Sequence, residues 1–254
     1  MEAEWQARTE LLVGAEGVTL LREAHVLVVG LGGVGAMAAE VLARAGVGSM
    51  TIADGDRVQP TNLNRQLVAL HSTLGRSKAE AMAQRLLDIN PELKVRVVGE
   101  FLKGQPLVDL VREPYSVVVD AIDTLSPKVF LIVEAVGAGN RVVSAMGCGG
   151  KLDVSQVQTG SFWSVQNCRL ASTMRKRMRH LGFKADFRAV YSTELSKAES
   201  VVHCEEEQNR KSRVGVIAYM PLLFGTLLAA EAVRVVLGEV KEKEFYHKPL
   251  VGVL

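Results

Sequence analysis

The sequence is poor in cysteine and in aromatic residues, and neither sign of charge prevails. It has three cysteines and no Cys-x-x-Cys pair, which excludes a disulfide scaffold and a four-thiolate zinc site. Lys and Arg number 30 against 28 Asp and Glu, a net charge of +2, which is too balanced for a protein that coats DNA. The N-terminus lacks the apolar stretch of a secretory signal, so we expect a cytoplasmic protein.

The chain is long and apolar enough to bury a large core. Its 254 residues are 48% hydrophobic, which is typical of a single globular domain. The uncharged run over residues 214–230 contains Pro221 and Gly225 and falls short of the ~20 residues of a spanning helix. We therefore expect a buried helix over residues 220–237, and partition of the chain into membranes would contradict this.

Short β-branched runs alternate with helical patterns through the first 150 residues. The expected strands are 24–30, 49–53, 95–98, 116–121 and 141–145, and the expected helices are 34–45, 76–89, 107–112 and 127–138. This alternation predicts an α/β fold with a mainly parallel, Rossmann-like sheet and helices on both faces. In the C-terminal half we expect an added half-exposed antiparallel strand over 151–159, a basic helix over 171–181 and a mobile loop over 201–213.

A glycine-rich segment follows the first expected strand and begins a helix. Gly30, Gly32, Gly33 and Gly35 lie in the sequence Gly-Leu-Gly-Gly-Val-Gly, and such glycines let the backbone approach a phosphate at a helix N-terminus. Asp54, after the second strand, fits the acidic residue that accepts hydrogen bonds from ribose hydroxyls. Together these residues predict an adenine-nucleotide site.

The polar residues that follow the second and fourth strands favour ATP over NAD. A triphosphate and its departing pyrophosphate require cations, which Arg65 and Lys78 supply. Asn62 and Asn64 could orient phosphate or ribose oxygens, and Asp123 at the carboxyl edge of the sheet suits Mg²⁺. The alternatives are an NAD-dependent oxidoreductase or a nucleotide-sensing module, with the two cations in surface salt bridges.

As a set, these motifs resemble the ubiquitin-activating-type adenylating superfamily of ThiF- and MoeB-like enzymes. The segments that carry the resemblance are Gly30–Gly35, Asp54, Thr61–Gln66, Lys78 and Asp120–Asp123. The resemblance implies ATP and Mg²⁺ at the glycine loop, with Asp54 on the ribose, Arg65 and Lys78 on the phosphates and Asp123 on the metal. It also implies a homodimer in which Arg8 reaches into the ATP site of the partner.

Four further segments, at residues 34–47, 64–69, 147–156 and 191–194, are similar to the tRNA threonylcarbamoyladenosine dehydratases. This resemblance implies one adenylating domain over residues 1–254, with a nucleotide-binding part at 24–150 and a substrate-binding and dimerisation part at 151–254. It implies that the carboxylate of a modified adenosine in tRNA is adenylated, and that an internal nitrogen then displaces AMP. Adenylation of the C-terminal glycine of a ubiquitin-like sulfur-carrier protein is the alternative.

A tRNA substrate requires phosphate contacts, and one basic stretch could supply them. Its cations include Arg175, Lys176, Arg177 and Arg179, for which an ordinary solvated helix face is an equal alternative.

The cysteines and the partners leave several points open. Cys148 is expected to be a small buried residue, whereas an acyl-carrying role for Cys168 or Cys204 is open. A sulfurtransferase- or cysteine-desulfurase-type protein partner, and a monovalent cation at the dimer interface, are open as well.

Overall fold

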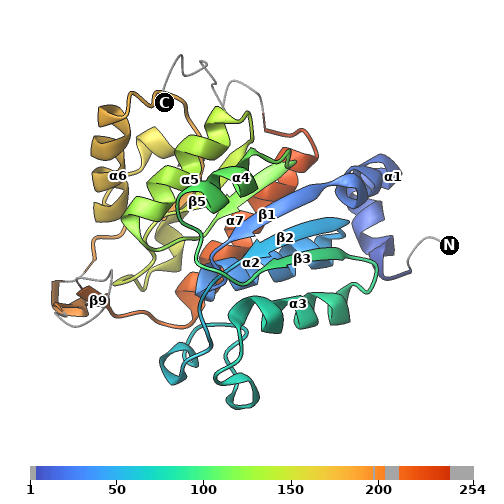
Figure 1. Cartoon of the computed structure of the whole chain (residues 1–254), viewed down its shortest axis with the longest axis horizontal. Coiled ribbons are helices and arrows are strands. Elements are labelled where there is room, and N and C mark those ends of the chain that lie inside the picture. The colour runs from blue at the N-terminus through green and yellow to red at the C-terminus, as the bar shows by residue number, and fades with distance from the viewer. Residues whose placement is uncertain (1–3, 197, 204–211, 241–254) are drawn as a thin grey trace.

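The computed structural model describes residues 4–196, 198–203 and 212–240, and a twisted sheet forms its centre (Figure 1). The strand order is β3-β2-β1-β4-β5-β7-β6, and all neighbouring pairs run parallel except β7 and β6. The strands are β1 His25–Val29, β2 Ser49–Ala53, β3 Lys94–Val98, β4 Val117–Asp120, β5 Val142–Ala145, β6 Val157–Ser161 and β7 Arg188–Ser192. The order reverses between β1 and β4, which is where ligands bind in such sheets.

Helices cover both faces of the sheet, as the sequence predicts. One layer holds α2 (Gly33–Ala45), α3 (Lys78–Ile89) and α7 (Tyr219–Val236), and the other holds α4 (Gln105–Arg112), α5 (Leu125–Gly137) and α6 (Arg169–His180). Side chains alternate along each strand, so Val26 and Val28 pack on the first layer and Leu27 and Val29 on the second. The expected Rossmann-like α/β fold is confirmed.

The uncharged run ends in helix α7, which is long and apolar enough to cross a membrane by length and composition alone. Half of that window is buried. Met220, Phe224 and Leu228 lie in the core, because α7 packs along α2 and the sheet. The structure therefore contains the expected buried helix.

Two expectations for the C-terminal half were wrong in part. The edge strand β6 begins at Val157 rather than at residue 151, because Asp153 accepts a hydrogen bond from the Ser155 N–H (2.9 Å) and caps a 3-10 turn. Within residues 201–213, expected to be a loop, β8 (Val201–His203) and β9 (Ser212–Val214) pair antiparallel. Residues 204–211, and with them Cys204, lie outside the described residues.

The sequence analysis did not predict helix α1 (Ala7–Glu23). Its charged and apolar residues follow no clean helical period, and Gly14 interrupts it with a φ of +73°, a conformation that favours glycine. The piece before this kink carries Leu11 and Leu12, which are 89% and 86% exposed. These two neighbouring leucines form an exposed apolar surface of the kind found at protein–protein contacts.

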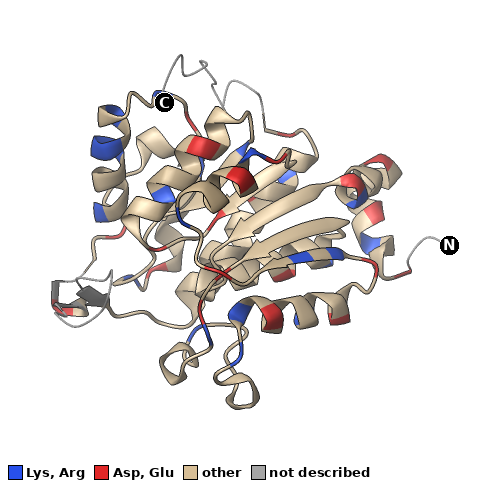
Figure 2. Ribbon diagram, viewed as in Figure 1, with Lys and Arg blue, Asp and Glu red and all other residues tan. Residues whose placement is uncertain are grey.

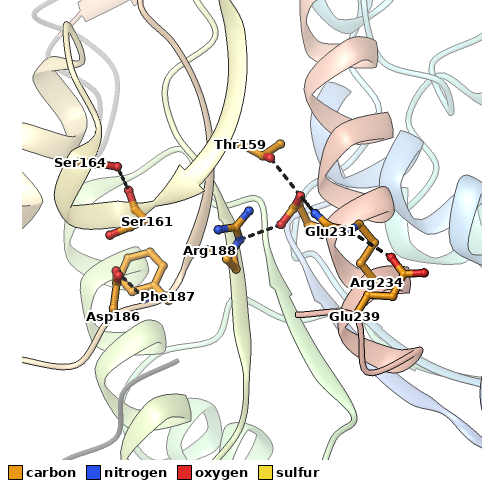
Figure 3. A network of polar contacts seen from close by, with 9 residues as sticks. All are labelled: Thr159, Ser161, Ser164, Asp186, Phe187, Arg188, Glu231, Arg234 and Glu239. Atoms are coloured by element: carbon orange, nitrogen blue, oxygen red, sulfur yellow. Dashed lines mark hydrogen bonds and ion pairs between the residues drawn. The ribbon is translucent and has the colours of Figure 1, made fainter. Parts of the chain in front are cut away.

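A buried ion pair joins β7 to α7 and provides a test of acid stability (Figure 3). Glu231 accepts hydrogen bonds from Arg188 (2.7 Å) and Thr159 (2.9 Å). Burial alone would raise the pKa of Glu231, but the hydrogen bond and charge of Arg188 bring this pKa below its ordinary value of 4.5. The stability that the pair contributes is thus present above that value and is lost as the pH falls through the lower, folded-state pKa.

We expect Glu231→Gln to cost roughly 3 kcal/mol in the free energy of unfolding at pH 7, because it leaves Arg188 without its carboxylate. Urea unfolding of both proteins at a series of pH values measures this. The difference between wild type and variant should begin to shrink below about pH 4.5, where the carboxylate of the unfolded chain is protonated, and it should be lost once the pH has fallen below the folded-state pKa. A difference that stays constant down to pH 3 would contradict the assignment.

Candidate functional site

The glycine loop between β1 and α2 leaves room for a ligand at one position only. A Cβ at Gly30 (φ +88°) would lie 2.9 Å from the Ala121 carbonyl oxygen, so the loop packs tightly against the end of β4. At Gly32 a Cβ would meet nothing nearer than the Gln66 Nε2 atom, at 3.8 Å. The N-terminus of α2 adjoins this opening at Gly32, and the N–H groups at a helix N-terminus suit an anion.

Asp54 at the end of β2 is bound into this loop. Its carboxylate accepts hydrogen bonds from the Leu31 N–H (2.6 Å) and the Asp56 N–H (2.7 Å). Burial raises the pKa of Asp54, and the positive charge of Lys78 opposes that rise. The structure thus brings together the glycine loop, Asp54 and Lys78, as the sequence predicts.

Lys78, the first residue of α3, is buried and already oriented. Its Nζ atom lies 2.8 Å from an Asp56 carboxylate oxygen, and Asp56 was given no role by the sequence analysis. The Lys78 N–H also donates to the Asp56 carbonyl. Asp56 therefore holds Lys78 beside Asp54, the residue expected to bind the ribose. The sequence signal that could have identified Asp56 is its position two residues after Asp54.

The segment that carries the other predicted polar residues is tied together by its own side chains. Arg65 donates to the Thr61 carbonyl (2.8 Å) and to the Asn64 side-chain oxygen (3.0 Å). Asn64 in turn donates to the Val216 carbonyl (3.2 Å), and the Asn62 oxygen accepts the Gln59 N–H (3.0 Å). In this structure, Asn62 and Asn64 shape the segment that positions Arg65.

Asp123 and Cys148 lie beyond the ends of the adjacent strands β4 and β5. Asp123 is exposed, and Cys148 is partly buried. Burial raises the pKa of the Cys148 thiol to about 11, with smaller opposing effects of Arg65, which lowers it, and Asp123, which raises it. The charges of Arg65 and Asp123 thus both act on Cys148, and the raised pKa makes Cys148 a poor nucleophile at neutral pH.

Cys168 has a structural position. It is buried, and its sulfur accepts a hydrogen bond from the Ala171 N–H (3.5 Å) at the start of α6. A helix-capping thiol in the core needs no catalytic explanation.

Gln66 was missed as a possible ligand-facing residue. It is buried against the glycine loop, and its Oε1 atom has no hydrogen-bond partner in the described part of the chain. A buried amide with an unpaired atom requires an explanation, such as a ligand or water. The available sequence signal was its place at the end of the Thr61–Gln66 segment, directly after Arg65.

The residues present fit a magnesium ion that arrives with a triphosphate, although they do not form a metal cage. Among the described residues no group of three or more His, Cys, Asp or Glu side chains gathers as a metal site. Mg²⁺ usually takes one or two carboxylates and completes its coordination with phosphate oxygens and water. The exposed carboxylate of Asp123 is chemically suited to this mode of binding.

Arg8 is far from this site within one chain. It is exposed in the first turn of α1, and Gln6, two residues earlier, lies against Gly46, just after α2 ends. Since α2 begins at the glycine loop and rises about 1.5 Å per residue, its 13 residues separate Gln6 from the anion site by about 20 Å.

Basic residues lie along α6 (Figure 2), and their surroundings differ. Arg175 is half-buried and donates to the Val165 carbonyl (2.9 Å), so it has a structural role. Arg177 donates to Ser126 (2.6 Å) at the start of α5, and Arg179 lies 5.5 Å from the centre of the Trp163 ring. Because Ser126 follows Asp123 by three residues, the exposed basic side of α6 adjoins the carboxyl edge of the sheet.

Comparison with known proteins gives a consistent result over nearly the whole chain. The model of the ThiF family matches residues 6–251. A tRNA threonylcarbamoyladenosine dehydratase of Escherichia coli K12 is 39% identical over 203 residues, which is 79% of this chain and 73% of that protein. The sulfur carrier protein ThiS adenylyltransferase of the same organism is 34% identical over 144 residues, 56% of this chain and 57% of that one.

Among solved structures, that of the E. coli tRNA N6-threonylcarbamoyladenosine dehydratase in complex with ATP is similar, with a TM-score of 0.84 and 32% identity. The match covers 94% of this chain and 98% of that one.

Proposed function

We propose that this chain, which belongs to the ThiF family, is an ATP-dependent tRNA threonylcarbamoyladenosine dehydratase. The observation that carries the proposal is the opening at Gly32 beside the N-terminus of α2, with Asp54 and Lys78 at the glycine loop and the charges of Arg65 and Asp123 acting on Cys148 beyond the adjacent strand. Backbone amides alone would serve a dinucleotide. Cations and a carboxylate at the same edge of the sheet suit a triphosphate that must lose pyrophosphate.

The reaction needs one site and two displacements. An oxygen of the substrate carboxylate attacks the α-phosphorus of ATP, and pyrophosphate leaves with its electron pair. A nitrogen of the same substrate then attacks the activated carbonyl carbon, and AMP leaves with the carboxylate oxygen. The ring closure therefore removes the elements of water, with the oxygen carried away by AMP. The reaction requires no enzyme thiol, because the nucleophile belongs to the substrate, and the raised pKa of Cys148 is consistent with this.

The residues divide these tasks by position. Asp54 is held by the Leu31 and Asp56 amides and orients the ribose, and the N–H groups of α2 bind phosphate oxygens. Arg65 and Lys78 stabilise the charge on the leaving pyrophosphate. Asp123 would hold Mg²⁺, whose charge, when bound, neutralises phosphate oxygens.

The protein is proposed to act as a homodimer in the cytoplasm, with residues 24–150 binding the nucleotide and residues 151–254 binding substrate and partner. Leu11 and Leu12 are exposed, which supports a second copy as the cover of α1. Arg8 on the same helix would then reach the partner's ATP site. A sulfurtransferase- or cysteine-desulfurase-type protein is a further proposed partner, which co-purification would test.

The tRNA backbone is proposed to lie along the exposed basic side of α6, through Lys176, Arg177 and Arg179. We expect the Lys176→Ala/Arg179→Ala double variant to weaken tRNA binding and to reduce the slope of log affinity against log salt by about 2, one for each lost phosphate contact. Filter binding from 50 to 300 mM KCl measures this. Lys94→Ala on the opposite edge strand β3 is the matched control. If the double variant gave the same slope as wild type, α6 would be excluded from the RNA-binding surface.

Mass spectrometry of nucleosides tests the proposed activity. Purified protein, ATP and tRNA that carries threonylcarbamoyladenosine should yield a nucleoside lighter by one water, with AMP and pyrophosphate formed only when this tRNA is present. The alternative, a sulfur-carrier adenylyltransferase, predicts an acyl-adenylate on a small ubiquitin-like protein and no need for RNA. Unchanged tRNA nucleosides would refute the first function.

A further inference from the structure

A fully enclosed polar cluster lies at the base of the loop that carries Asp123. Lys128 of α5 and Asp120 of β4 are both 0% exposed, and their Nζ and Oδ2 atoms are 2.6 Å apart. Ser144 of the neighbouring strand β5 donates to the same Oδ2 atom at 2.6 Å. All three side chains are enclosed by protein, so any effect that they have on a ligand must pass through another residue.

The cluster forms hydrogen bonds with both the backbone N–H and the backbone carbonyl of Ile122, the residue before Asp123. The other oxygen of Asp120 accepts the Ile122 N–H (3.1 Å), and Lys128 donates to the Ile122 carbonyl (3.1 Å). That carbonyl belongs to the peptide bond between Ile122 and Asp123. The two hydrogen bonds with Asp120 and Lys128 therefore fix the orientation of this peptide. They thereby set the direction in which the Asp123 side chain leaves the backbone.

Stability alone does not explain such a cluster. Burying two charges has a large desolvation cost, and apolar residues of similar volume are often as stable or more stable. Helix α5 is otherwise mostly apolar on its buried side, with Val129, Leu131 and Ile132 beside Lys128. What an apolar residue at this position could not do is donate a hydrogen bond to the Ile122 carbonyl.

We infer that Asp120, Lys128 and Ser144 are positioning residues that set the Asp123 carboxylate for metal-assisted binding of the triphosphate. The inference rests on the proposed function, because it takes Asp123 as the residue that meets the magnesium-bound nucleotide. Groups that orient a metal ligand typically change metal affinity or activity by 10- to 100-fold when removed.

The test compares two hydroxyl deletions of the same kind. Ser144→Ala removes a donor to the acid of the Lys128–Asp120 pair, and Thr159→Val removes a donor to the acid of the Arg188–Glu231 pair. Arg188 is the first residue of β7, which runs parallel to β5, so the second pair (Figure 3) lies toward the opposite, amino edge of the sheet. Both variants lose one hydroxyl hydrogen bond to a buried carboxylate, and only the first adjoins Asp123.

Two measurements on the full chain separate positioning from stability. Calorimetry should show about 10-fold weaker ATP binding by Ser144→Ala with Mg²⁺ present, and wild-type affinity with a chelator in its place. Amide hydrogen exchange without nucleotide should be faster for residues 121–124 in Ser144→Ala. Thr159→Val should match wild type in both measurements.

Wild-type exchange and wild-type magnesium-dependent affinity in Ser144→Ala would overturn the inference. If Ser144→Ala does not fold, the Asp120→Asn/Lys128→Met double variant, which leaves no lone buried charge, takes its place with the same expected results. Failure of the proposed function is seen separately, because a wild-type protein that binds no ATP in the presence of Mg²⁺ would refute the nucleotide site itself.

Discussion

Asp123→Asn should abolish turnover while the protein stays folded. The substitution keeps the size of the side chain and removes its charge from an exposed position beyond β4, so the free energy of unfolding should change by no more than about 0.5 kcal/mol. The rate should fall at least about 100-fold, the loss seen when one group that stabilises transition-state charge is removed.

Formation of AMP in a discontinuous assay, together with urea unfolding of the same sample, measures both quantities. Asp109→Asn, an exposed carboxylate of α4, is the matched control and should turn over at the wild-type rate. Full activity of Asp123→Asn would remove Asp123 from the site, and its loss of activity through unfolding would make it a structural residue instead.

Arg8→Ala should also lower turnover about 100-fold. Part of the activity should return when Arg8→Ala chains form mixed dimers with chains that are inactive because of a different substitution. If Arg8 acts on the partner's site, a mixed dimer of Arg8→Ala and Asp123→Asn has one complete site, which combines the intact Asp123 of one chain with the intact Arg8 of the other. Random reassortment makes about half of the dimers mixed, each with one of two sites active, so about a quarter of wild-type activity should return.

Mixtures of Arg65→Ala and Asp123→Asn serve as the control, since both residues lie around Cys148 in one chain and no pairing restores a complete site. No recovery in the Arg8 mixture either would contradict a shared site. Arg8 would then act at neither site, because it also lies far from the anion site of its own chain.

The strands and helices that carry strong local signals were predictable from sequence. β1, β2, β4 and β5 are short runs that contain β-branched residues, and α2 begins at Gly33 and is followed by Gly46, so pattern and turn chemistry agree there. Helix α1 was not predictable, because Gly14 interrupts it and its apolar residues lie on different sides: Leu11 and Leu12 before the kink are exposed, whereas Val18 and Leu21 after it are buried. Such a sequence does not follow one continuous amphipathic period.

The site residues likewise divide into those that could be predicted from the sequence and those that only the structure reveals. Gly32, Asp54, Lys78 and Asp123 could be proposed because each follows a strand or begins a helix at one sheet edge, and Arg65 because a triphosphate requires cations. Their supports could not, since nothing local ties Asp56 to Lys78 or Ser144 to Asp120; only the folded sheet brings β5 beside β4. Gln66 belongs to the Thr61–Gln66 segment but carries no charge, and its buried, unpaired amide oxygen is visible only in three dimensions.

The central claim is that one site adenylates a carboxylate and then expels the same oxygen with AMP. It is tested most directly with tRNA whose threonylcarbamoyladenosine carries ¹⁸O in both carboxylate oxygens. After reaction with unlabelled ATP, the account predicts one ¹⁸O in each AMP and one left in the cyclised nucleoside, with unlabelled pyrophosphate. Label in orthophosphate together with ADP, or AMP free of label, would contradict it.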